Sequence, residues 1–120
     1  MPHIKLDHTE NVKPSLIKLV FNDLKIIMME YACVKEENCK CKAILIPIYA
    51  VGSNDTSGHF YHIEISLLKG RSENIKEKIG QKSLQVLQKY FTDINGEHKK
   101  QFSIEIRDIN PKNYFTSNAL

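Results

Sequence analysis

The chain has 120 residues, of which 42% are hydrophobic and 26% charged, so it is long enough for one soluble domain with its own core. Its 17 basic and 14 acidic residues give a net charge of +3, and the basic residues are scattered, which argues against a nucleic-acid partner. The longest apolar run, residues 43–51, is far shorter than the roughly 20 residues of a membrane-spanning helix, so we expect no membrane partner.

The N-terminus and the cysteines indicate the compartment. Charged side chains such as Lys5 and Asp7 interrupt any apolar signal-peptide core, so we expect a cytoplasmic protein. The odd cysteine count of 3 then fits reduced thiols better than a disulfide framework.

The first half of the chain predicts a strand, a helix and a strand. Residues 1–6 alternate as a short strand, with Pro2 on its apolar face. Apolar residues recur at helical spacing over 14–31, and the proline at 14 suits the first turn of a helix. The isoleucine-rich run 43–51 predicts a strand covered on both faces, although Pro47 within it indicates an edge position or a bulge.

The second half predicts the same succession. After a turn cluster at 52–58, residues 59–68 alternate as a strand. Ser72 is a plausible N-cap for a helix with an apolar stripe. Asn95-Gly96 then predicts a turn, and residues 102–107 alternate as the last strand.

These elements predict a single α+β domain over residues 1–120. It consists of two strand–helix–strand units, about 1–52 and 58–109, and a C-terminal tail, 110–120. Each crossover helix packs on one face of the sheet, which gives a four-stranded sheet with two helices on one face. We expect the opposite face to carry apolar residues as well, and an exposed apolar face predicts an oligomer.

Pro2 is the first candidate for chemistry. Aminopeptidases usually remove methionine before a small residue, which would make Pro2 an N-terminal secondary amine. An α-amino group has a reference pKa of about 7.7 to 8.0, and a dry pocket lowers that pKa further. Such an amine is a competent general base near neutral pH. Taken alone, however, Met-Pro is also an ordinary start for a protein.

Three basic residues are candidates for holding a carboxylate. Arg71, within Gly70-Arg71-Ser72, has a planar fork of donors and lies beside a predicted helix N-terminus. Lys40 and Lys42 precede the apolar run and would act as point charges. Each of these residues, taken alone, is equally well explained as a solvated surface charge.

The cysteines and histidines predict no metal site. Structural zinc sites need four ligands, whereas Cys33, Cys39 and Cys41 are the only cysteines and the histidines form no HxxxH or HExxH pattern. His62 lies on the polar face of its predicted strand, where a proton-transfer role and a packed or solvated histidine both remain open.

Three stretches together, Met1-Pro2-His3, residues 60–72 and residues 102–115, resemble the 5-carboxymethyl-2-hydroxymuconate Δ-isomerase family of the tautomerase superfamily. The resemblance implies a tautomerase-like βαββαβ protomer, a homotrimer, and no metal or organic cofactor. It also implies an isomerase of aromatic compound catabolism, which converts 5-carboxymethyl-2-hydroxymuconate to its 2-oxo-3-ene isomer in homoprotocatechuate and 4-hydroxyphenylacetate degradation. The substrate would be a small polycarboxylate.

By position, the resemblance makes Pro2 the base and Arg71 a ligand of a substrate carboxylate. Lys40 stands where the family carries a second arginine, and Lys42 aligns with another basic position. Lysine keeps the charge but loses the bidentate fork, so we expect a different grip on the substrate. Two alternatives stay open: a tautomerase paralogue acting on another 2-hydroxy-dienoate or enol, and a non-catalytic trimeric binding module that retains Met1.

Overall fold

The computed structural model describes residues 1–53, 57–93 and 99–117. The predicted Asn95-Gly96 turn, the middle of the 52–58 turn cluster and the last three residues of the tail lie outside the described residues. The elements are β1 (His3–His8), α1 (Pro14–Tyr31), β2 (Lys40–Leu45), β3 (His59–Leu68), α2 (Glu73–Phe91) and β4 (Lys100–Ile109), with 3₁₀ turns at Glu36–Asn38 and Pro111–Asn113. This succession confirms the predicted α+β class and the βαββαβ order.

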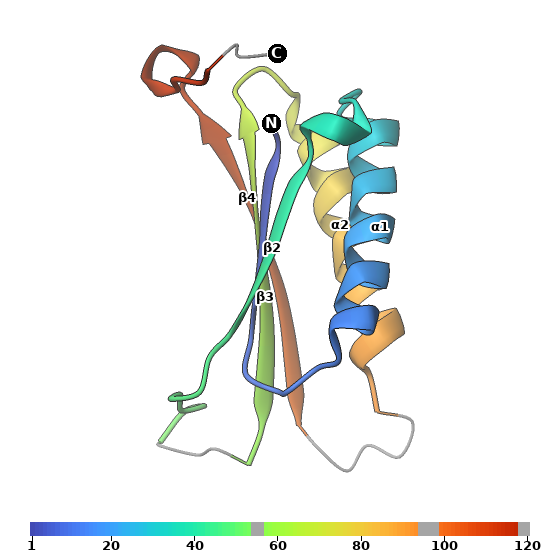
Figure 1. The fold of residues 1–120 in the computed structure, drawn as a ribbon, viewed down its shortest axis with the longest axis vertical. Helices are drawn as coiled ribbons and strands as arrows, with labels where there is room; N and C mark the ends of the chain where they lie inside the picture. The colour runs from blue at the N-terminus through green and yellow to red at the C-terminus, as the bar shows by residue number, and fades with distance from the viewer. Residues whose placement is uncertain (54–56, 94–98, 118–120) are drawn as a thin grey trace.

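The four strands form one sheet in the order β2-β1-β3-β4. Within each half, the two strands run parallel, β1 with β2 and β3 with β4, and the halves meet where β1 pairs antiparallel with β3. Both helices cover the same face of the sheet (Figure 1). The architecture is therefore the predicted pair of strand–helix–strand units with one helical layer.

The core lies between the sheet and the helices. Alternate residues of β3 are fully buried because they point at the helical layer, while their neighbours point away. The largest fully buried side chains are Pro2, Ile4, Leu6, Val20, Leu24, Met28, Tyr61, Ile63, Ile65, Leu67, Ile79 and Leu87. Pro2 thus shares the buried face of β1 with Ile4 and Leu6, as predicted. Neither helix in the described parts of the chain has the length and apolar character to cross a membrane.

The prediction for the second strand was wrong in its bounds and its burial. β2 spans Lys40–Leu45 rather than 43–51, and Pro47 follows its end. The last hydrogen bond toward β1 is donated by the Ile46 amide to the His8 carbonyl, at 2.8 Å. Proline has no amide hydrogen with which to continue the ladder. β2 is an edge strand, so residues such as Ile44 are exposed rather than covered on both faces.

The open sheet face is more polar than expected, although it includes the exposed Ile44 at its β2 edge. The face away from the helices carries a chain of charges, because alternation turns the polar residues of every strand toward it. Glu64 of β3 lies 4.0 Å from the Lys5 ammonium and 3.6 Å from the Arg107 guanidinium, and Arg107 also pairs with Glu105 at 3.0 Å. This largely charged face can therefore remain in water.

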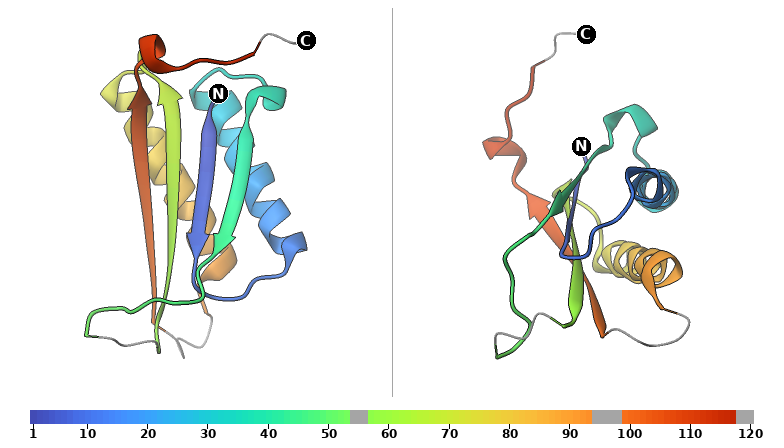
Figure 2. Two further views of the ribbon diagram at one scale, coloured as in Figure 1. Left: turned by 60° about the vertical axis from the view of Figure 1, so that its left-hand side comes forward. Right: turned by 60° about the horizontal axis from the view of Figure 1, so that its bottom comes forward.

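One end of the sheet gathers three segments that are distant in sequence. The N-terminus, the end of β3 and the C-terminal tail lie at the same end of the molecule (Figures 1 and 2). The parallel and antiparallel pairings explain this, because β1 starts where β3 and β4 finish. The candidate active site is built at this end.

Candidate active site

Pro2 lies just before β1, and hydrogen bonds fix both Pro2 and the preceding N-terminus. The Pro2 carbonyl accepts a 3.0 Å hydrogen bond from the Lys40 amide, which aligns the start of β1 with the start of β2. In the structure Met1 precedes Pro2, and the Met1 amino group donates to the Asn38 carbonyl at 2.9 Å. The side chain of Pro2 is fully buried, so its ring is held rigidly at the end of the strand.

A cavity of about 660 Å³ lies at this end of the molecule. It is lined by Met1, Asn38, Lys40, Leu68, Tyr114, Thr116 and Ser117. These residues come from the N-terminus, the start of β2, the end of β3 and the tail. Because Met1 is bonded to the Pro2 nitrogen, removal of Met1 would leave that nitrogen as a free amine at the edge of the cavity.

The two predicted lysines lie on the open face of β2 and are separated by one residue. Lys40 lines the cavity, and its ammonium donates to the Asn38 carbonyl at 3.4 Å. Lys42 lies farther along the strand and lines, together with Lys40 and His3, a smaller hollow of about 90 Å³. Lys40 is therefore the sequence-predicted cation that the structure places beside Met1.

Arg71 is engaged with backbone carbonyls instead of lining the cavity. Its guanidinium donates to the carbonyl of Leu68 at 3.0 Å and to that of Ala32, the C-cap of α1, at 2.9 Å. Gly70 reverses the chain between β3 and α2 with a φ of 139°, a conformation that other residues rarely adopt. In this chain Arg71 thus ties the end of β3, which contributes Leu68 to the cavity, to the end of α1.

The tail supplies functional-site candidates that the sequence reasoning missed. Tyr114 lines the cavity, and its hydroxyl shares a 2.9 Å hydrogen bond with Nε2 of His3. The preceding turn is ordered because the Asn110 side chain accepts a 3.0 Å hydrogen bond from the Lys112 amide. The available signal was Asn110-Pro111, because Asn followed by Pro commonly starts a turn. A turn there predicts that the tail changes direction after the last strand.

The environment of the N-terminus disfavours protonated bases. Burial, and then the nearby Lys40 charge, lower the pKa of the Met1 amino group below its ordinary value of 8.0. Burial also lowers the pKa of His3, with further contributions from the N-terminal charge and the two lysines. An amine in these surroundings therefore loses its proton at a lower pH than a free N-terminus does, which favours the neutral form that can accept a proton.

The remaining sequence candidates are not among the residues that line the cavity. Nδ1 of His62 shares a 2.6 Å hydrogen bond with the Ser103 hydroxyl, and its Nε2 lies 3.4 Å from Glu105, within the charged open face of the sheet. Burial raises the pKa of the Cys39 thiol and that of the Cys41 thiol, the latter to about 11. Across residues 1–53, 57–93 and 99–117, no group of three His, Cys, Asp or Glu side chains is arranged to hold a metal ion.

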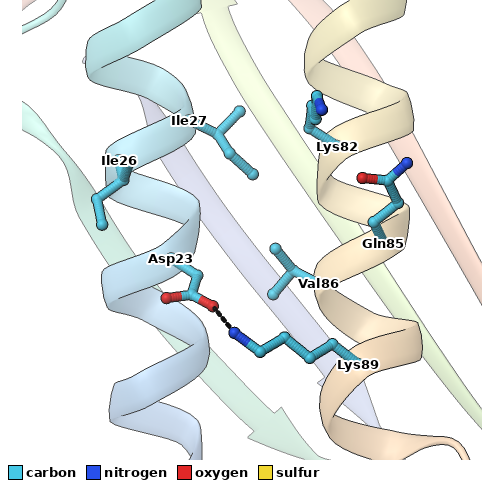
Figure 3. Close-up of a pocket in the computed structure, with 7 residues that line it drawn as sticks. All are labelled: Asp23, Ile26, Ile27, Lys82, Gln85, Val86 and Lys89. Atoms are coloured by element: carbon cyan, nitrogen blue, oxygen red, sulfur yellow. Dashed lines mark hydrogen bonds and ion pairs between the residues drawn. The ribbon is translucent and has the colours of Figure 1, made fainter.

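A second cavity, of about 270 Å³, lies between the two helices (Figure 3). Its apolar floor includes Ile27 and Val86. On its rim the Lys89 ammonium lies 3.4 Å from the Asp23 carboxylate, and Lys82 also lines the cavity. It contains none of the predicted site residues, so the cavity beside Met1 is the better candidate.

Comparison with known proteins places the chain in a family. The family model for 5-carboxymethyl-2-hydroxymuconate isomerase matches residues 2–120. A search of curated proteins found no match.

Solved structures share the fold. A 5-carboxymethyl-2-hydroxymuconate isomerase from Deinococcus radiodurans R1 is 23% identical, with a TM-score of 0.83 over 98% of this chain and 89% of that one. A 5-carboxymethyl-2-hydroxymuconate delta-isomerase is 16% identical, with a TM-score of 0.78 over 98% and 87%. A fused 4-OT described as a symmetric trimer is 12% identical, with a TM-score of 0.79 over 98% and 94%. Because the family model matches nearly the whole chain, this chain belongs to the 5-carboxymethyl-2-hydroxymuconate isomerase family.

Proposed function

We propose that this chain is a keto–enol isomerase that converts 5-carboxymethyl-2-hydroxymuconate to its 2-oxo-3-ene isomer, with Pro2 as the general base. The observation that carries the proposal is the position of Met1, which is bonded to the Pro2 nitrogen and lines the same cavity as Lys40. Removal of Met1 would create a secondary amine in surroundings that lower the pKa of an N-terminal amine.

A single amine at this position is sufficient for the reaction. The neutral Pro2 nitrogen takes the proton from the 2-hydroxyl oxygen, and the resulting ammonium returns a proton to a distant carbon of the dienol. The electron pair of the breaking O–H bond forms the second bond of the keto carbonyl. The carbon–carbon double bonds shift toward the carbon that receives the proton, so no other reactant is consumed. Positioned acid–base catalysis of this kind contributes about 10²- to 10⁴-fold.

Cationic side chains complete the proposed site. Lys40 would hold a substrate carboxylate and stabilise negative charge on the dienolate, with Lys42 adding to the positive potential. Arg71 has five N–H donors in all, so the two bonds to Leu68 and Ala32 leave others for a second carboxylate. We propose this role for Arg71 together with the structural tie described above.

The proposal includes a homotrimer that works in the cytoplasm, in the degradation of homoprotocatechuate and 4-hydroxyphenylacetate. Two similar structures are described as trimers of fused 4-OT. On this chain, Ile48 is 89% exposed just beyond β2 and Phe115 is 88% exposed in the tail. We propose that contact with neighbouring subunits covers both of these side chains.

The test is an ultraviolet assay of dienol loss on 5-carboxymethyl-2-hydroxymuconate. Protein whose intact mass shows Pro2 at the N-terminus is compared with protein that retains Met1. We expect rapid turnover from the first sample and none from the second, because an amide nitrogen is not basic. Equal activity in both samples would exclude Pro2 as the base.

A different 2-hydroxy-dienoate is the second candidate substrate. It is favoured by a specific observation: Lys40 lines the cavity without a bidentate fork, while Arg71 is engaged with backbone carbonyls. Phenylenolpyruvate and 2-hydroxymuconate, assayed beside the first substrate, separate the two possibilities by their kcat/KM values. If processed protein turns over none of the three, a binding role replaces the enzymatic one.

A further inference from the structure

We propose that the C-terminal segment Tyr114–Ser117 is a specificity wall that binds a carboxylate at the far end of the substrate from the reacting enol. In this proposal the Tyr114 hydroxyl donates to that carboxylate, and His3 is the residue that positions Tyr114. The inference rests on the proposed function, because it concerns the same cavity, and it adds the residues that select a substrate with a second, separated carboxylate.

The C-terminal tail changes direction after β4 and runs back toward the N-terminus. β4 ends at Ile109, and the 3₁₀ turn Pro111–Asn113 changes the direction of the chain. Its turn is held by the Asn113 amide, which donates to the Asn110 carbonyl at 2.9 Å. Figure 2 shows the tail crossing over the end of the sheet where the N-terminus lies. The tail thereby contributes to the lining of the cavity.

The cavity has two kinds of polar lining. One side carries the Lys40 ammonium, and the tail contributes three residues with hydroxyl groups, Tyr114, Thr116 and Ser117. A monocarboxylate needs only the lysine for charge pairing. A dicarboxylate can place its second group against the hydroxyls, which are hydrogen-bond donors of the kind an anionic oxygen accepts. The lining therefore favours a dianion that spans the cavity.

His3 holds the Tyr114 side chain in place. Its Nε2 lies 2.9 Å from the Tyr114 oxygen, and the two ring centroids are 5.9 Å apart. When the imidazole carries its hydrogen on Nε2, that N–H donates to the phenol oxygen and leaves the phenol O–H free to donate to a ligand. His3 belongs to β1 and directly follows Pro2, so its contact with Tyr114 fixes the position of the tail relative to Pro2.

The test measures binding of two unreactive five-carbon acids, glutarate and valerate, by calorimetry on Pro2-terminated protein. Glutarate has a carboxylate at each end and valerate has one. We expect wild-type protein to bind glutarate more tightly. Tyr114→Phe should weaken glutarate binding about tenfold or more and leave valerate binding unchanged, because it removes one hydrogen bond to a charged group. Tyr90→Phe removes a hydroxyl that donates to Asp23 on the helical surface and should change neither affinity.

His3 is tested by rescue. His3→Leu should weaken glutarate binding as Tyr114→Phe does, whereas His3→Gln keeps an N–H donor and should restore at least part of the affinity. With the dienol substrate, His3→Leu should raise KM and leave kcat largely unchanged, since the wall binds a group remote from the proton transfer. Thr116→Val, which deletes a second hydroxyl of the wall, gives an independent measurement if Tyr114→Phe does not fold.

Three results would overturn the proposal: equal binding of glutarate and valerate by wild-type protein, equal loss of both in Tyr114→Phe, or no loss in any wall variant. Because calorimetry needs no turnover, its outcome is separate from that of the ultraviolet assay. Selective glutarate binding with no isomerase activity would leave the wall standing and remove the proposed reaction. Turnover without selective glutarate binding would support the proposed reaction and overturn the wall.

Discussion

Lys40 is the side chain that connects the predicted basic residues to the cavity. It is the direct register partner of His3 on the neighbouring strand and lies beside the N-terminus. There burial and the Lys40 charge lower the pKa of the Met1 amino group. Arg71, by contrast, is half-buried against the carbonyls of Leu68 and Ala32. Lysine therefore provides the more accessible positive charge in the site of this chain.

We predict that Lys40→Ala raises KM for the dienol substrate about tenfold or more, because it removes a charged partner of a carboxylate. Lys40→Arg should retain or improve binding, since it keeps the charge and adds a bidentate fork. Steady-state kinetics check both variants. Lys78→Ala, on the exposed surface of α2, is the matched loss of charge and should leave KM unchanged. A Lys40→Ala variant with wild-type KM would contradict the assignment.

The strands carry a second polar cluster at their other end, away from the cavity. Glu10, just after β1, accepts a short hydrogen bond from the Tyr61 hydroxyl of β3 and pairs at 2.9 Å with the ammonium of Lys100, the first residue of β4. Lys100 also pairs with Asp93 at 3.1 Å, after the end of α2. This cluster joins the two halves of the chain beside the end of α2.

We predict that this cluster makes stability depend on pH through Glu10. Burial by itself would raise the pKa of Glu10, but the hydrogen bonds from Tyr61 and Lys100 outweigh it and lower that pKa below 4.5. The folded pKa is below the unfolded one, so the stabilisation is present above pH 4.5 and is lost as pH falls through the folded pKa.

Urea unfolding at neutral pH and at about pH 3 measures the effect. Glu10→Gln should lower the free energy of unfolding at neutral pH by about 1 to 3 kcal/mol and should flatten its decline in acid. Glu77→Gln removes an exposed carboxylate of α2 that accepts only from Gln81, and should change stability by less than about 0.5 kcal/mol. Parallel acid profiles for wild type and Glu10→Gln would rule out this explanation.

The whole molecule shows where a partner subunit would be expected. Its open sheet face is mainly charged, so the exposed apolar residues of the edge strand β2 and of the segment after it are the better candidates for a subunit contact. Ile44, Leu45 and Ile48 are exposed there, on the unpaired side of the sheet. Exposed edges with apolar residues invite pairing with another chain, which is how a closed oligomer would remove this edge.

We predict that the protein sediments at three times the 13.9 kDa of one chain. Ile48→Glu should weaken assembly at least about tenfold, because it places a charge in an apolar contact. Analytical ultracentrifugation over a range of concentrations checks this. Ile26→Glu, at a position of α1 that is 54% exposed, is the control and should remain assembled. Unchanged sedimentation of Ile48→Glu would place the interface elsewhere.

Much of the fold was predictable because periodicity is a local property. The bounds of α1 and β3 were predicted to the residue, since a proline start and a strict alternation mark them. Ser72 was predicted as an N-cap, and its hydroxyl accepts the Ile75 amide at 3.3 Å. The bounds and burial of the second strand were predicted wrongly because the apolar run by itself favoured a strand covered on both faces. Only Pro47 within the run indicated an edge position.

The sequence by itself determined the order of elements, the place of Pro2 on the apolar face of the first strand and the family to which the chain belongs. Only the tertiary structure decided which basic residue lines the cavity, what Arg71 contacts, and that His3 meets Tyr114 from the other end of the chain. The physical reason is distance along the chain. Alternation and helical spacing are set by neighbouring residues, whereas a contact between residues 3 and 114 depends on sheet register and on the turn that follows β4.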